Sequence, residues 1–511
     1  MKTSRHQKLA RRKRRIERRL RPRTWRAQPT PMFRASHMQY EHSDRVRGLA
    51  SGGVGAMHRL AQHTGLVAAL DRHVKLLKVH LPYHESDHVL NVAYNILCGG
   101  TCLQDLEQRR QDEVYLDALG AQRIPDPTTA GDFCRRFDEA AIEALQAAIN
   151  ETRVRVWRAQ PPAFFDEAII DADGTLAETT GQCKEGMDIA YNGVWGYHPL
   201  VVSLANTGEP LYLVNRSGNR PSSEGAAERF DQAHALCRDA GFQRVTFRGD
   251  TDFSQTAHLD RWDADGVRFV FGYDARPNLI GLADALPAAA WTPLVRRPPD
   301  AVQTEPRQRP VNVKEATIVA REFTTLRLEA EAVAEFPYQP TACATPYRMV
   351  IVRKNISVER GEHRLIDQIR YFFYLTNDHE TAASAVVFLA NDRCNQENLI
   401  DQLKHGVGAT RMPVDTLVSN WAYMVMAALA WTLKAWFALR LPETGRWAAR
   451  YAAEKAAVLR MEFKAFLHAF MLIPVQVVRT SRRLVFRLLA WNPWQAVFLR
   501  GFDQWRAPLR C

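Results

Sequence analysis

The 511 residues are 46% apolar, enough to bury sizeable cores, and the length favours about three domains. Eight cysteines without a CxxC pair or a zinc-type His/Cys cluster argue against a disulfide framework and against a structural zinc site, so we expect reduced thiols in a cytoplasmic protein. The N-terminal segment lacks an apolar run, which argues against a secretory signal.

Basic residues are concentrated at the two ends of the chain. The net charge of the chain is +12. Residues 1–26 hold thirteen Lys and Arg and the single acid Glu17, so the charge of this segment equals that of the whole chain. Residues 432–511 hold fourteen basic and four acidic residues, which leaves residues 27–431 net acidic. Basic ends suit a polyanion such as nucleic acid, because neutralised phosphates release counterions.

Residues 1–44 are expected to be disordered or only conditionally helical. Arg11–Arg15 and Arg18–Arg23 are so densely charged that repulsion opposes independent folding. If this arm binds nucleic acid, the contacts would come from Arg11, Arg12, Arg14 and Arg15. A generic RNA-binding tail, a membrane-surface segment and a calmodulin-type target are the alternatives.

Residues 45–158 have the apolar spacing of helices. Gly99 and Gly100 would end one helix, and a Thr after Pro125-Asp126-Pro127 would cap another. The expected helices are Gly53–Ala69, Ser86–Leu97, Leu103–Leu119, Ala130–Phe137 and Ala140–Trp157. Short helices joined by tight turns can form a helix-turn-helix that enters a DNA groove, but a scaffold that packs on the next domain has the same pattern.

Residues 159–280 change to the pattern of alternating strands and helices. Strands are expected at Phe164–Ala172, His198–Ala205, Leu211–Val214, Arg244–Arg248 and Val267–Gly272. Asn206–Glu209 would join the second and third strands in a hairpin. One helix would run from a cap at Ser222 or Ser223 to Ala240, and another over Ser254–Ala264. This order predicts a mixed sheet with helices on its faces.

The remaining chain divides into three parts. Residues 281–377 are rich in Pro and in strand-like runs such as Tyr347–Val352 and Arg370–Leu375, which indicates a β-rich insertion. Residues 378–440 are helical, and the 13-residue apolar run Trp421–Leu433 is shorter than the ~20 residues that span a bilayer, so we expect a buried helix. Residues 441–511 are expected to form a basic helical region.

Acidic residues at three places in the chain carry the chemical signal. Asp171 and Asp173 lie two residues apart at the end of the first strand, so they share a face and repel each other unless a cation offsets their charge. A solvated turn is the alternative, since acid-Gly turns are common. Asp250 ends the fourth strand, with Asp252 as a weaker rival, and Glu397 lies on a late helix. If the first and fourth strands are neighbours, these carboxylates can hold two Mg²⁺ ions for phosphoryl transfer.

The motifs DADGT at 171–175, RGDTDF at 248–253 and NDRCNQENLIDQLK at 391–404 resemble those of the DDE transposases, specifically the insertion-sequence group IS1380. Arg393, Glu397 and Lys404 match the Y-x2-R-x3-E-x6-K signature of the wider IS4-type transposases, whereas Ala390 replaces its Tyr. The resemblance covers roughly residues 45–440 and includes PDPTT and RSGNRPSSEGA.

The resemblance implies an RNase H-like mixed-sheet α/β core, in two parts at 159–280 and 378–440, around the β-rich insertion at 281–377. It implies a helical DNA-binding domain at 45–158, while charge and composition indicate the basic arm at 1–44 and the basic helical region at 441–511. Asp173, Asp250 and Glu397 would be catalytic metal ligands for two Mg²⁺ or Mn²⁺ ions, and Asp171 competes with Asp173. Arg393 and Lys404 would contact DNA.

By the same resemblance, the activity is cleavage at terminal inverted repeats and strand transfer into target DNA, with double-stranded DNA as partner and a homodimer in the DNA complex. An RNase H-like structure-specific nuclease, a DNA-binding protein that no longer cleaves and a metal-free hydrolase are the alternatives.

Overall fold

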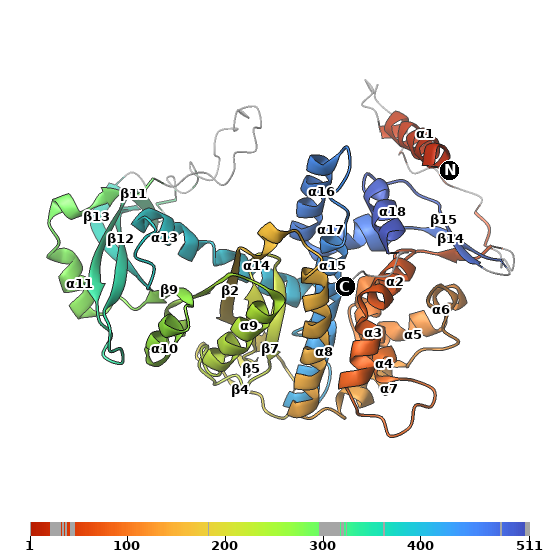
Figure 1. Cartoon of the computed structure of the whole chain (residues 1–511), viewed down its shortest axis with the longest axis horizontal. Coiled ribbons are helices and arrows are strands. Elements are labelled where there is room, and N and C mark those ends of the chain that lie inside the picture. Colours follow the sequence, from red (N-terminus) through yellow and green to blue (C-terminus); the bar gives the residue numbers. More distant parts are fainter. Residues whose placement is uncertain are drawn as a thin grey trace.

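A nine-stranded mixed sheet runs through much of the molecule, in the order β10-β11-β12-β13-β9-β8-β2-β6-β7 (Figure 1). The computed structural model describes residues 2–20, 46–181, 183–295, 324–360, 363–480 and 483–505, together with 32, 35, 38–40, 317, 321 and 322. Most of the predicted basic arm beyond residue 20 and part of the Pro-rich insertion lie outside the described residues.

The central strands confirm the predicted order. They are β2 (Glu167–Gly174), β6 (Leu200–Leu204), β7 (Glu209–Val214), β8 (Arg244–Gly249) and β9 (Arg268–Tyr273). β2, β8 and β9 are parallel neighbours, whereas β6 and β7 form the predicted antiparallel hairpin and β6 pairs antiparallel with β2. The sheet is therefore mixed, as the order of elements predicts.

Each face of this sheet meets a different helix. On one face Phe230 of α9 (Ala226–Ala240) stacks on Phe247 of β8, with 4.5 Å between ring centroids. On the other face Asp173 of β2 meets Arg393, which precedes α14 (Cys394–Asp401). The acids thus lie on the α14 face, because side chains alternate along a strand.

Two predicted helix caps are wrong. The side chain of Asp126 caps α7 (Pro127–Cys134) by accepting a hydrogen bond from the Thr129 amide at 2.8 Å, so the acid rather than a Thr caps this helix. Gly225 precedes α9 with φ of +74°, and no side chain caps that helix. The predicted helix Ser254–Ala264 is shorter, since α10 spans only Leu259–Ala264 after two 3-10 turns.

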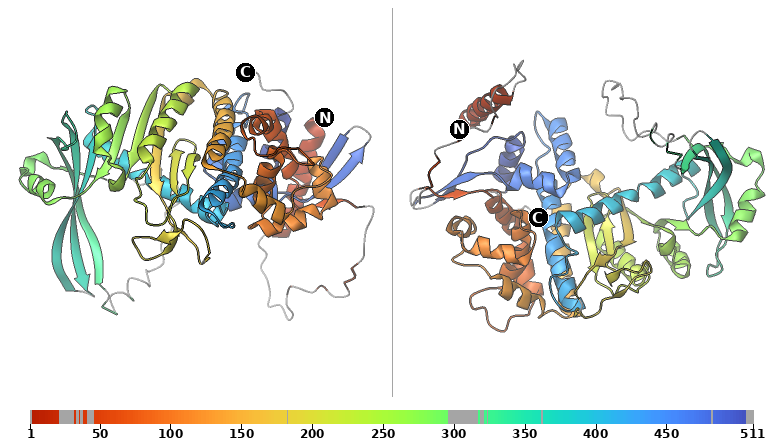
Figure 2. Two further views of the ribbon diagram at one scale, coloured as in Figure 1. Left: turned by 90° about the horizontal axis from the view of Figure 1, so that it is seen from below. Right: turned by 180° about the vertical axis from the view of Figure 1, so that it is seen from behind.

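The predicted insertion does not form a sheet of its own. β11 (Thr324–Tyr338), β12 (Tyr347–Arg360) and β13 (His363–Thr376) are antiparallel, and β13 pairs with β9 over Val270–Tyr273. α11 (Pro277–Asp284) and the short β10 (Thr292–Pro293) precede them. The β content was predicted correctly, but edge pairing with β9 makes the insertion an extension of the central sheet (Figure 2).

The region before the sheet is helical as predicted, with more breaks. Gly65 has φ of +80°, so the expected helix Gly53–Ala69 divides there. The expected helix Leu103–Leu119 divides at Asp112, whose side chain caps the third piece. The helices are α2 (Val54–Thr64), α3 (Leu66–His73), α4 (Glu85–Leu97), η1 (Leu103–Asp105), α5 (Leu106–Arg110), α6 (Glu113–Leu119), α7 and α8 (Glu139–Trp157).

The helix α15 (Leu417–Leu439) lies in the centre of the hydrophobic core. At 23 residues it is longer than the apolar run predicted, and by length and composition it could cross a membrane, yet its most apolar window is entirely buried inside the molecule. It contacts α2, α4, α7, α8, α16 (Ala448–Arg460) and β7. The prediction of a buried helix is confirmed, and the N-terminal helices pack on it as the scaffold alternative predicts.

Lys434 is buried in α15, and we expect that replacing it with Met stabilises the fold at low pH. Its Nζ donates to the Leu459 carbonyl and lies 4.0 Å from the Trp431 ring centroid, while burial lowers its pKa to about 7. The unfolded chain keeps the ordinary value near 10.5, so the unfolded state binds more protons between pH 7 and 10.5 and stability rises with pH there.

Thermal unfolding at several pH values measures this effect. The Lys434→Met variant should be more stable than the parent by about 1–3 kcal/mol at pH 6, and the gain should shrink as pH rises from 7 to 10. If the variant is less stable at pH 6, the hydrogen bond to Leu459 outweighs the cost of the buried charge.

The C-terminal region is not wholly helical, which corrects the prediction for residues 441–511. α16, α17 (Phe463–Phe466) and α18 (Gln495–Gln504) are helices, but β14 (Val475–Thr480) and β15 (Arg483–Leu488) form a hairpin whose β14 pairs with β1 (Gly48–Leu49). Val475 and Val477 are buried and alternate with less buried residues, the period of a strand.

The arm, expected to be disordered or only conditionally helical, is helical over α1 (Lys2–Leu20). Arg and Lys have high intrinsic helix propensity, and Lys13 forms an i,i+4 ion pair with Glu17 at 3.6 Å. The Arg12 guanidinium also donates to the carbonyls of Leu488 and Ala490, so tertiary contacts hold the helix against the C-terminal hairpin.

Candidate functional site

Two of the predicted acids meet at one edge of the sheet. β2 and β8 are parallel, and their register aligns Asp171 with Arg248. Asp173 lies two residues further along β2, and Asp250 directly follows the end of β8 at Gly249. The carboxyl ends of these neighbouring strands therefore bring together two acids that are far apart in the sequence.

Arg393 joins the third acid to this edge. Its guanidinium lies 3.0 Å from Asp173 Oδ2 and 3.7 Å from Glu397 Oε1, and its charge also acts on Asp250. The Arg393 side chain is only 18% exposed, whereas that of Glu397 is 63% exposed. The i,i+4 pair expected on one helix face is present, but Arg393 is more than a surface partner because it also contacts Asp173.

Burial perturbs both strand-end carboxyls. It raises the pKa of Asp173 to about 6; the Asp250 carboxylate adds to this and Arg393 opposes it. Burial also raises the pKa of Asp250, again against the effect of Arg393. Both groups would become more acidic if a further cation were held beside them, which is the behaviour of carboxylates arranged for a metal ion.

Asp171 has a different partner from Asp173. It is 1% exposed, and its two oxygens accept from Nε and Nη2 of Arg248, each at 2.7 Å. The third guanidinium nitrogen of Arg248 donates to the Leu389 carbonyl in α13 (Ala383–Asn391). This buried bidentate pair links β2 and β8 to the helix before α14, so both Asp171 oxygens already have a protein cation.

Asp252 supports Asp250 through its backbone. The Asp252 amide donates to Asp250 Oδ1 at 3.0 Å, which caps the 3-10 turn η3 (Thr251–Phe253). The Asp252 side chain is exposed. Of these two rivals, Asp250 is the one near Arg393.

Gln396 anchors α14 to the sheet through hydrogen bonds to β6. Its side-chain amide donates to the Val201 carbonyl at 3.0 Å and accepts from the Ser203 hydroxyl. Val201 is the register partner of Asp173, so this anchor places the first turn of α14 over that acid. Sequence reasoning missed Gln396, although its spacing from Leu399, Ile400 and Leu403 marks it as part of the buried face.

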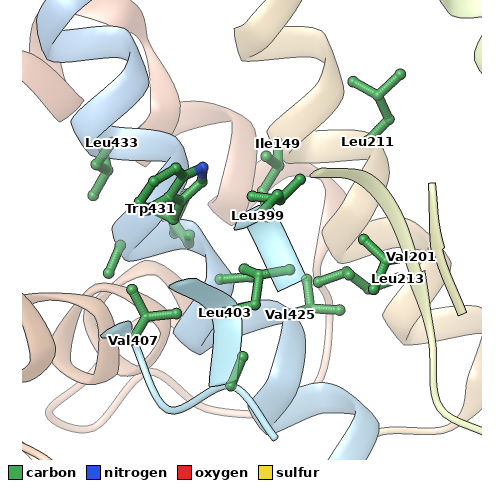
Figure 3. Packing of buried hydrophobic residues seen from close by; sticks show 14 of the residues in the cluster. Ile149, Val201, Leu211, Leu213, Leu399, Leu403, Val407, Val425, Trp431 and Leu433 are labelled. Atoms are coloured by element: carbon green, nitrogen blue, oxygen red, sulfur yellow. The ribbon is translucent and has the colours of Figure 1, made fainter. Parts of the chain in front are cut away.

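The same helix face packs into the main core (Figure 3). Leu399 and Leu403 lie among Val201, Val425 and Trp431, which belong to β6 and α15. Glu397 lies outside this buried face and is mostly exposed, so it can turn toward a ligand without disturbing the core.

Lys404 is also brought to this site. It lies in the π-helical turn η6 (Gln402–Gly406), is half-buried, and is close enough to Asp173 for that acid to act on its titration. Burial lowers the pKa of Lys404, and Asp401 and Asp173 partly offset this effect. In contrast, the four predicted arginines of the N-terminal arm lie on α1, at another end of the molecule (Figure 1).

The loop after β7 closes over the end of β2. A Cβ on Gly174 would lie 2.8 Å from His198 Nε2, so only glycine permits this approach. His198 Nδ1 is 2.8 Å from the Arg220 carbonyl, and Arg216 donates to the carbonyls of Pro221, Ser222 and Glu224. The motif RSGNRPSSEGA thus forms a hydrogen-bonded loop that packs against the end of β2, next to Asp173.

Within the described residues, the one set of three metal-ligating atoms within 4.8 Å of one another is away from this edge, at His80, His84 and Glu85. Glu85 accepts from the amides of Leu76 and Leu77, and the two imidazole rings are stacked 9° from parallel. Stacked rings direct their nitrogens into separate planes, so this set is unsuited to one ion. The three predicted acids surround Arg393 in a wider arrangement.

The fold and this site define a mixed α/β protein whose carboxylates gather at the ends of two parallel strands and on one helix. A family described as transposase DDE domain group 1 matches residues 47–507, and the chain belongs to that family. The resemblance to DDE transposases is confirmed, while the match does not distinguish the IS1380 group.

No curated protein gives a significant match. Among solved structures, the cryo-EM structure of a piggyBac transposase synaptic complex with hairpin DNA is similar, with 11% sequence identity over 83% of this chain and 79% of that chain and a TM-score of 0.37.

Proposed function

We propose that the chain is the transposase of an IS1380-type insertion sequence. It binds the terminal inverted repeats, cuts DNA strands there and transfers them to target DNA. The observation that carries this proposal is the meeting of Asp173, Asp250 and Glu397 around Arg393, in a chain of the DDE transposase family.

Divalent metal ions fit this donor set. Asp173 and Asp250 are buried oxygen donors with raised pKa values, and the exposed Glu397 can turn toward them. Asp173, Asp250 and Glu397 would hold two Mg²⁺ ions, for which Mn²⁺ can substitute. Bound there, the ions would activate the attacking water or 3′-hydroxyl and stabilise the leaving oxygen. The Asp171–Arg248 pair favours Asp173 as the first ligand.

The protein's own residues position the DNA. Arg393 already bridges Asp173 and Glu397 and would turn part of its fork to a phosphate oxygen near the cut. Lys404 is half-buried, lies within electrostatic range of Asp173 and would neutralise a neighbouring phosphate. The Asp171–Arg248 pair holds β2 and β8 together, and Gln396 holds α14 on the sheet, while Arg393 and Lys404 contact the phosphates.

An RNase H-like core is part of this proposal. The antiparallel β2, β6 and β7 followed by the parallel β8 and β9 support it, as does the position of the inserted strands between the second acid and the carboxylate helix. Because two element ends must be held together, we expect a homodimer on double-stranded DNA.

A cleavage assay tests the function. A duplex that carries the inverted repeats flanking this gene should be cut at the repeat boundary with Mg²⁺, remain intact in EDTA, and remain intact with the Glu397→Gln variant. Because Glu397 is 63% exposed, this variant should fold and bind the repeats as the parent does.

Other outcomes identify the alternatives. Cutting without joining to target DNA indicates a structure-specific nuclease, and binding without cutting under every condition indicates a DNA-binding protein. Activity that survives EDTA would contradict metal dependence.

A further inference from the structure

A cleft lies between α1 and the C-terminal hairpin. These two elements lie at the end of the molecule opposite strands β11, β12 and β13 (Figures 1 and 2). Its volume is about 850 Å³. Five of the side chains that line it are cations, and among the described residues none of the lining side chains is acidic; the cations are Lys8, Arg11, Arg12, Arg15 and Arg487.

This cationic cleft brings like charges together from distant parts of the sequence. Arg12 donates to the carbonyls of Leu488 and Ala490, so α1 is held against β15 with its arginines facing Arg487. The one acid of α1, Glu17, pairs with Lys13 outside the cleft. Within the described residues, the repulsion inside the cleft therefore has no internal acid to offset it, and an anion would do so.

The spacing of the cations favours an extended polyanion over a single small anion. Lys8, Arg11, Arg12 and Arg15 follow i, i+3, i+4 and i+7 spacing on one helix face, a row about 10 Å long. Phosphates of one DNA strand recur every ~3.4 Å of axis, so the row can face about three of them. Arginine predominates, and its planar fork suits phosphate oxygens.

We propose that the cationic cleft binds the backbone of double-stranded DNA, away from the bond that is cut. This inference rests on the proposed function, because a transposase must hold a longer DNA segment than the one at its acids. A membrane surface fits less well, since the apolar Leu9 faces into the cleft and is not free to enter lipid.

Matched variants of the full chain test the cleft. In Arg11→Glu/Arg15→Glu both reversed charges line it, whereas Arg18→Glu/Arg19→Glu has the same charge change on the same helix but lies outside it. Binding to a duplex with the terminal repeat is measured in EDTA, at several salt concentrations, so that no metal-dependent cutting intervenes.

The first variant should bind at least about tenfold more weakly near physiological salt and flatten the plot of log affinity against log salt by about two units. The control should change both much less. Arg487→Glu should also weaken binding, and combining it with the first variant should cost less than the product of the separate effects, because both contact the same phosphates.

Equal effects of the two double variants would overturn the proposal, since they would show diffuse attraction by the whole helix. The proposal would also be overturned if the combined variant lost affinity by the full product of the losses of Arg11→Glu/Arg15→Glu and Arg487→Glu. Tighter binding to a double-stranded RNA of the same sequence would overturn it too. Failure of the proposed transposase activity gives a different result from failure of the cleft proposal, because the parent protein would then not cut DNA with Mg²⁺.

Discussion

Replacing Asp173 with Asn should reduce DNA cleavage by roughly 10³-fold or more while leaving binding of the element ends and the melting temperature nearly unchanged. The substitution keeps the size of the side chain and its contact distance from Arg393, 3.0 Å in the parent, but removes the negative charge that a divalent cation needs. Asp250→Asn should have the same effect, because Asp250 directly follows the adjacent parallel strand β8. Single-turnover cleavage, binding of the ends and thermal unfolding measure the three quantities.

Asp171→Asn is the matched control, since the two acids are neighbours on one strand. Arg248, 3% exposed, would lose its anionic partner, and an unpaired buried charge typically costs about 3–5 kcal/mol. We therefore expect a large loss of stability, with cleavage per folded molecule largely retained at low temperature. The reverse pattern, a stable but inactive Asp171→Asn variant and an active Asp173→Asn variant, would contradict the assignment.

Replacing Glu209 with Gln should destabilise the fold by about 3–5 kcal/mol. Glu209 is fully buried at the start of β7 and accepts four hydrogen bonds, from Arg153 and Trp157 of α8, Trp436 of α15, and Thr207 of the hairpin turn, at 2.7–3.1 Å. An amide would leave the buried Arg153 charge unpaired. Its NH₂ group would also replace one acceptor oxygen, so that two hydrogen-bond donors would face each other.

Glu107→Gln provides the comparison for this prediction. Glu107 forms an exposed i,i+3 pair with Arg110 at 2.9 Å, and solvent-exposed pairs contribute little to stability. Denaturant unfolding of the two variants should therefore differ widely. Equal small losses would mean that the core around Glu209 admits water or rearranges.

The local sequence determined the elements of the site. Apolar runs that end in acids predicted β2 and β8, the Asn206–Glu209 turn predicted the β6–β7 hairpin, and the i,i+4 spacing predicted that Arg393 and Glu397 share a helix face. These features depend on residues within a few positions of one another, so periodicity and turn chemistry are sufficient to predict them.

Tertiary structure alone decided which groups are partners. Asp171 and Asp173 are equivalent in sequence, and only the parallel register of β2 with β8, 77 residues away, gives Asp171 a bidentate arginine and leaves Asp173 facing Arg393. The pairing of β13 with β9 and the docking of α1 on β15 likewise join segments far apart in the chain. Such contacts arise from the packing of whole elements, and the pattern of any single segment does not encode them.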